Sequence, residues 1–181
     1  TSMGGLLGMV VAAQADSPVE RLVVNDVGPA IEPAALERIK TYVGADPTFP
    51  TWKAFGECVR AISPFGPLDD AQWEHLTRTV GRERPDGRIG FVYDPGIAVP
   101  FREAPAPPDL WPVWQAIRCP TLLLRGAASD LLSSATAGRM TETGPRPRLV
   151  EFEGVGHAPM LLVPDQVAAV VGFLRDTPAS G

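Results

Sequence analysis

Ser2, Asp130 and His157 have the residue types and the chain order of a nucleophile, an acid and a base that act together. A serine hydroxyl is a weak nucleophile, so it needs a histidine that takes its proton and returns it to the leaving group. A carboxylate holds that histidine in the correct tautomer and stabilises the imidazolium ion. Asp130 follows Ser2 by 128 residues and precedes His157 by 27. The shorter interval has room for a helix and a strand, and the longer one for a strand and an inserted domain.

These residues need a scaffold that brings distant segments together, and both ends of the chain alternate between helices and strands. Short aliphatic runs bounded by turn residues predict buried strands at residues 21–25, 121–125 and 148–152. Apolar or amphipathic segments predict helices at residues 3–15, 135–141 and 164–176. Because ligands of parallel sheets bind beyond the carboxyl ends of the strands, the loops that follow these strands should converge. The pattern predicts an α/β fold with Ser2, Asp130 and His157 at one sheet edge.

The middle of the chain is rich in proline, tryptophan and charged residues and has little strand pattern. Helical periodicity predicts helices at residues 33–43, 51–62, 68–80 and near 114–117. We therefore expect three parts, namely a core segment at residues 1–30, an inserted helical cap at 31–117 and a second core segment at 118–181. The tryptophans of the middle part are expected to form the cap core and its contacts with the body.

Four short motifs resemble those of the α/β-hydrolase fold superfamily. SMGG at residues 2–5 resembles the end of the nucleophile elbow, and LLLRGAASD at 122–130 resembles the acid-bearing strand and loop. GVGHAP at 154–159 resembles the histidine loop, and LVVNDVGP at 22–29 resembles another strand of the sheet. The resemblance implies the C-terminal part of an α/β-hydrolase fold, a parallel sheet flanked by helices, with an inserted helical cap.

The resemblance also implies a role for each candidate residue. Ser2 would be the nucleophile in a strained turn that needs small neighbours, and Gly4 and Gly5 meet that need. The backbone N–H of Met3, at the start of a helix, would be one donor of the oxyanion hole. The first glycine of the elbow, the strand before it and the loop that carries the second donor are not in the sequence. We expect an N-terminal half of the same fold as a separate fragment or as a segment not included here.

Two aspartates compete for the role of the acid. Asp130 is preferred because its loop resembles the acid loop of the family, and Asp26 is the alternative because it also follows a predicted strand. His157 is preferred as the base because the other histidine, His75, lies on a predicted cap helix where a solvated role is expected. The preferred triad is Ser2, His157 and Asp130.

Composition argues against several other classes of protein. The chain has 16 basic and 21 acidic residues, a formal charge of −5, and its basic residues are scattered, so no nucleic-acid partner is expected. The longest apolar run, residues 3–13, is shorter than the roughly 20 residues that cross a bilayer, so no membrane partner is expected. Cys58 and Cys119 lack the spacing of metal ligands, so no metal and no cofactor are expected, and so few cysteines favour the cytoplasm.

The leading hypothesis is a serine hydrolase that cleaves a small-molecule carboxylic ester through an acyl-enzyme. Lactonases, carbon–carbon bond hydrolases and cofactor-free perhydrolases on the same fold are alternatives, since the cap decides among them. Thr1 supports an alternative of another class, the processed subunit of an N-terminal-nucleophile hydrolase, in which a terminal threonine attacks with its own amine as base. A binding protein with a hydrolase-like shape and no turnover is the third class.

Overall fold

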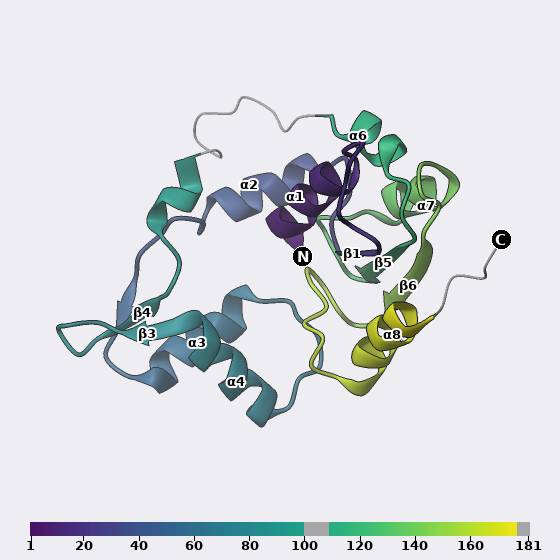
Figure 1. Ribbon diagram of the computed structural model, residues 1–181. Coiled ribbons are helices and arrows are strands. Elements are labelled where there is room, and N and C mark those ends of the chain that lie inside the picture. Colours follow the sequence, from purple (N-terminus) through teal and green to yellow (C-terminus); the bar gives the residue numbers. More distant parts are fainter. Residues whose placement is uncertain (100–108, 177–181) are drawn as a thin grey trace.

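A three-stranded parallel sheet lies in one half of the molecule, on the right in Figure 1. The computed structural model describes residues 1–99 and 109–176. The strands stand in the order β1-β5-β6, and they are β1 (Leu22–Asn25), β5 (Thr121–Gly126) and β6 (Arg148–Phe152). All six residues of the middle strand β5 are buried. The three predicted strands are therefore confirmed, each within about one residue of its predicted bounds.

Helices cover both faces of this sheet, and side chains alternate between the two sides as the strand period requires. One face packs against α1 (Ser2–Ala12) and α7 (Ser134–Glu142), with Leu123 of β5 in the same cluster as Met9 and Met140. The other face packs against α8 (Pro164–Arg175), and there Leu122 and Leu124 meet Phe173. Burying each such side chain stabilises the fold by about 1.5–3 kcal/mol.

The inserted part contains a second, smaller sheet that the helical prediction did not include. Its order is β2-β4-β3, antiparallel throughout, with β2 (Thr48–Phe49), β3 (Gly81–Glu83) and β4 (Ile89–Phe91). Strands of two or three residues are too short to give an alternating pattern, which explains the omission. The accompanying helices are α2 (Pro33–Lys40), α3 (Trp52–Ile62), α4 (Asp70–Val80), the 3₁₀ helix η1 (Pro95–Ala98) and α6 (Trp111–Ala116).

The hydrophobic residues of the inserted part belong to two separate clusters. Phe55, Trp73 and Phe91 belong to a cluster between α3, α4 and the small sheet, where the Phe55 and Phe91 rings meet edge to face with centroids 4.9 Å apart. In contrast, Trp111 and Trp114 of α6 are buried with Met9 and Leu123 on the face of the parallel sheet. The predicted boundary at residue 117 therefore separates α6 from the core of the parallel sheet, with which α6 packs. The division of the chain at residues 31 and 117 stays a prediction. Residues 100–108 of the predicted cap lie outside the described residues.

The inserted part touches the loop that follows β6. The backbone N–H of Gly156 donates to the Pro64 carbonyl at 2.7 Å, and Gln72 Nε2 donates to the Leu162 carbonyl at 2.8 Å. Leu162 and Met160 also pack against the aromatic cluster of the inserted part. These contacts hold the histidine loop from the side of the insertion, so both parts of the chain determine where His157 lies.

Candidate active site

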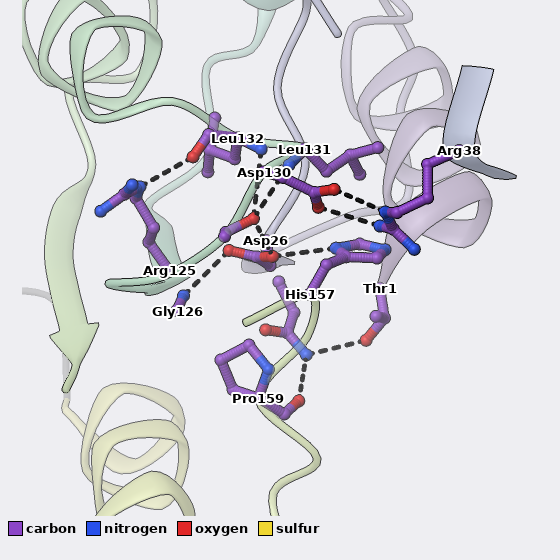
Figure 2. Close-up of polar contacts among 12 residues, drawn as sticks. Thr1, Asp26, Arg38, Arg125, Gly126, Asp130, Leu131, Leu132, His157 and Pro159 are labelled. Carbon is purple, nitrogen blue, oxygen red and sulfur yellow. Dashed lines mark hydrogen bonds and ion pairs between the residues drawn. The ribbon is translucent and has the colours of Figure 1, made fainter. Parts of the chain in front are cut away.

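Asp26 is a fully buried carboxylate at the carboxyl end of β1. It directly follows the last residue of the strand, and its own N–H extends the sheet by donating to the Leu124 carbonyl at 2.8 Å. Its backbone has φ 54°, in the left-handed region that few residues other than glycine adopt. The carboxylate accepts three hydrogen bonds, from Gly126 N–H at 2.9 Å, from Ser129 Oγ at 2.7 Å and from His157 Nδ1 at 2.8 Å. Figure 2 shows these bonds converging on one side chain.

The hydrogen bond with Asp26 determines which ring nitrogen of His157 carries a proton when the ring is neutral. Ser129 Oγ accepts the N–H groups of Leu131 and Leu132, at 3.2 and 3.3 Å, so its single proton is directed at Asp26. A carboxylate offers only acceptors, so Nδ1 of His157 carries the proton that it shares with Asp26. Nε2 of the neutral ring is then an acceptor. The side chain of His157 is 13% exposed, so a partly shielded base lies beside a buried anion.

Close packing between two loops brings the donors to Asp26. A Cβ atom added at Gly126 would lie 2.4 Å from the carbonyl oxygens of both Val155 and Gly156. Ala127 N–H donates to the Phe152 carbonyl and Ala128 N–H to the Val155 carbonyl, each at 2.9 Å. The loop after β5 therefore lies directly against the histidine loop, and only glycine fits at the point of closest approach.

The structure does not bring Asp130 to His157 as the sequence preference proposed. Its carboxylate faces Arg38 of α2 instead, with Oδ2 2.5 Å from Nε and Oδ1 2.9 Å from Nη2. The inward position of this loop is Ser129, which is buried, whereas the side chain of Asp130 is 44% exposed. The hydrogen bonds from Arg38 hold the pKa of Asp130 below its ordinary value, and partial burial of the carboxylate opposes this shift. The alternative acid, Asp26, is the one in contact with His157.

Ser2 begins α1 and has the backbone geometry of a strained turn. Its φ is 49°, in the left-handed region. Non-glycine residues in this region carry strain that is common at catalytic sites, and the elbow serine of the family sits on such a turn. The preceding residue, Thr1, is hydrogen-bonded through Oγ1 to Nδ2 of Asn25 at 2.9 Å. Asn25 is the neighbour of Asp26, so the segment of Ser2 is attached to the same end of β1.

The residues after Ser2 differ in what they contribute. Met3 is the second residue of α1, where no helical carbonyl can accept its N–H. A Cβ at Gly5 would lie 2.5 Å from Val27 Cγ1, so this glycine lets α1 approach the segment after β1. A Cβ at Gly4 would meet nothing within 4 Å. The predicted need for small residues is therefore supported by the packing at Gly5 alone.

Sequence reasoning did not single out Ser129, Gly126 or Asn25. Ser129 lies in the motif at residues 122–130, one position before Asp130, and its polar side chain is the signal that the sequence offers. His75, the other histidine, is exposed on α4, as expected.

No helix in residues 1–99 or 109–176 is both long and apolar enough to cross a membrane. In the same ranges, no three His, Cys, Asp or Glu side chains are grouped as a metal site would need.

Comparison with known proteins gives matches over nearly the whole chain. A family model described as the alpha/beta hydrolase family matches residues 1–170. A 3-hydroxybutyrate-oligomer hydrolase of Cupriavidus necator is 40% identical over 183 residues, which cover 96% of this chain and 62% of that protein. The crystal structure of an alpha/beta hydrolase from Novosphingobium aromaticivorans is 39% identical, with a TM-score of 0.86 over 96% of this chain and 63% of its own. A crystal structure from Rickettsia typhi is 28% identical, with a TM-score of 0.88 over 98% of this chain and 61% of its own.

The chain thus spans about three fifths of the length of these relatives. The matches do not support the prediction that a separate fragment supplies the missing strands. They do support the predicted fold class, since two structures with TM-scores above 0.8 have the same chain path. A parallel sheet between helices also differs from the stacked antiparallel sheets that the hypothesis based on Thr1 requires.

Proposed function

Because the chain belongs to the α/β hydrolase family, as its motifs predicted, we propose that it acts as a serine hydrolase that cleaves a carboxylic ester. In this proposal Ser2 is the nucleophile, His157 the general base and acid, and Asp26 the orienting acid in place of Asp130. The observation that carries it is the bond of 2.8 Å between His157 Nδ1 and the buried Asp26 carboxylate. That bond leaves Nε2 free to accept a proton.

The reaction proceeds in two halves through a covalent intermediate. His157 Nε2 takes the hydroxyl proton of Ser2 while the serine oxygen attacks the ester carbonyl. The oxyanion is stabilised by the backbone N–H of Met3. The histidine gives the proton to the leaving alcohol as the acyl-enzyme forms. A water deprotonated by the same nitrogen then releases the acid and restores Ser2.

Short esters of hydroxy acids are the first substrates to test. The relative from Cupriavidus necator is named a 3-hydroxybutyrate-oligomer hydrolase, and it is 40% identical over 96% of this chain. The same panel includes a lactone, a diketone whose carbon–carbon bond can be hydrolysed, and hydrogen peroxide as the acyl acceptor for perhydrolysis. These three test the alternative activities, because the triad alone does not determine which substrate is used. Preferential release of acid from linear esters supports the proposal, and turnover restricted to a different class would replace it.

Labelling with a fluorophosphonate probe tests the nucleophile and the base together. Ser2→Ala should abolish labelling, because the attacked oxygen is removed, and His157→Asn should slow it by at least about a hundredfold. Matched controls are Ser17→Ala, a serine whose Oγ accepts the Val19 N–H, and His75→Asn on the exposed side of α4. Both controls should label at the wild-type rate. Continued labelling of Ser2→Ala, or modification at Thr1, would contradict the proposal.

A further inference from the structure

Asn25, the last residue of β1, has a buried side chain that makes two long-range hydrogen bonds. The residue is 3% exposed. Its Nδ2 donates to Oγ1 of Thr1 at 2.9 Å and to the carbonyl oxygen of Pro159 at 2.8 Å. Figure 2 shows both bonds reaching the labelled Thr1 and Pro159 from a single nitrogen. The proposed reaction uses neither bond directly.

The chemistry of the partners determines the orientation of this amide. A peptide carbonyl can only accept, so the nitrogen of Asn25, and not its oxygen, must face Pro159. The second N–H of the same nitrogen then points to the hydroxyl of Thr1, which accepts it. Oδ1 of Asn25 is buried and has no hydrogen-bond partner among the described residues. Burying an unpaired acceptor opposes folding, and a valine, as at the two preceding positions of β1, would avoid that cost.

Asn25 and both partners of its amide lie within two positions of a residue of the proposed triad. Thr1 precedes Ser2, Asn25 precedes Asp26, and Pro159 lies two positions after His157. Successive Cα atoms are only about 3.8 Å apart, so fixing these three positions restricts the nearby triad residues. Proton transfer between a nucleophile and its base requires about 2.6–3.2 Å between heavy atoms, and a misplacement of 1 Å can cost about a hundredfold in rate.

We infer that Asn25 is a positioning residue that ties the segment of Ser2 to the histidine loop at the end of β1. It touches neither the reacting atoms nor the substrate, and it acts through the placement of Ser2 relative to His157. Thr1 then serves as an acceptor for this amide. The inference rests on the proposed function, because it assigns Ser2 and His157 the roles given above.

Four variants of the full chain test this role. Asn25→Leu removes both hydrogen bonds at similar side-chain volume, and Thr1→Val removes only the acceptor for one of them. The double variant of these two measures whether they act through the same contact. Thr1→Ser keeps the hydroxyl. The matched control is Thr77→Val, which makes the same chemical change at a buried threonine of α4 whose Oγ1 donates to the Trp73 carbonyl at 2.8 Å.

The readouts are the second-order rate constant for fluorophosphonate labelling, kcat and KM on a chromogenic ester, and Tm by circular dichroism. Asn25→Leu should lower the labelling rate and kcat by about 30- to 100-fold with little change in KM. Thr1→Val should lower them less, the double variant should be no slower than Asn25→Leu alone, and Thr1→Ser should recover most of the wild-type rate. Thr77→Val should lower Tm and leave kcat unchanged.

Three outcomes would overturn the inference. One is a labelling rate in Asn25→Leu or Thr1→Val equal to that of the wild type. Another is a fall in kcat for Thr77→Val as large as that for Thr1→Val at the same loss of Tm, which would make the effect one of general stability. The third is a double variant whose losses multiply, because the two side chains would then act separately. Failure of the proposed function is recognised differently, by undiminished labelling of Ser2→Ala.

Discussion

Replacing Asp26 with asparagine tests which aspartate orients His157, and the structure allows the outcome to be worked out atom by atom. The carboxylate accepts Gly126 N–H on Oδ1, and Ser129 Oγ and His157 Nδ1 on Oδ2. An asparagine nitrogen at the first position would face the backbone N–H of Gly126, which cannot accept. The nitrogen therefore takes the second position. There Nδ1 of His157 must lose its proton to become an acceptor, and the hydroxyl of Ser129, whose oxygen already accepts two N–H groups, loses its hydrogen bond to this side chain.

The asparagine thus reverses the tautomer of His157. With the proton moved to Nε2, the nitrogen that faces the nucleophile can no longer take a proton, and the negative charge that stabilises the imidazolium is also gone. We expect kcat to fall by about 10³- to 10⁴-fold. The fully buried site keeps most of its hydrogen bonds, so the loss of stability should be limited to about 1–3 kcal/mol. At about 2–4 °C per kcal/mol for a chain of this size, the folded state persists at 25 °C.

Asp130→Asn is the matched control, since it makes the same chemical change in the neighbouring loop. The side chains of Arg38 and Asp130 are 34% and 44% exposed, so their ion pair is worth about 0–1 kcal/mol. Even if the whole free energy of this ion pair were lost from the transition state, kcat would fall by no more than about fivefold. Steady-state kinetics on a chromogenic ester, with Tm recorded for both variants, measures the contrast. A nearly wild-type kcat for Asp26→Asn, or a thousandfold loss in Asp130→Asn, would refute the reasoning.

Three further predictions concern packing and pH. Gly126→Ala should lower stability by about 1–3 kcal/mol, measured by urea denaturation, because its Cβ would lie 2.4 Å from two carbonyl oxygens. Gly5→Ala should lower Tm, whereas Gly4→Ala, where a Cβ meets nothing within 4 Å, should raise the free energy of unfolding by up to about 1 kcal/mol. Arg38 lowers the pKa of Asp130, so their pair stabilises the fold above the pKa of the unfolded carboxyl and stops doing so as pH falls through the lower folded value. The small Tm difference between wild type and Asp130→Asn should therefore shrink below about pH 4.

The fold class could be predicted from the sequence, and Ser2 and His157 could be proposed from it, because their signals are local. Aliphatic runs of five residues bounded by turn formers predict buried strands wherever they occur, and β1, β5 and β6 lie where those runs are. Ser2 and His157 stand in short motifs whose glycines and order are specific. The structure adds independent support at Ser2, where φ is 49°, and at His157, which contacts a buried carboxylate. The short strands of the inserted part had no such signal.

Only the tertiary structure shows which of the two aspartates contacts His157. β1 and β5 are neighbours in the sheet, so Asp26 and Asp130 both reach the same edge, and motif similarity cannot distinguish them. The outcome depends on a difference of one residue in the loop after β5, where Ser129 faces inward and Asp130 outward. It also depends on Arg38, which is 92 positions away in sequence and reaches Asp130 only after α2 packs beside the loop. Side-chain direction and long-range pairing are properties of the folded chain, and a local pattern of residue types does not contain them.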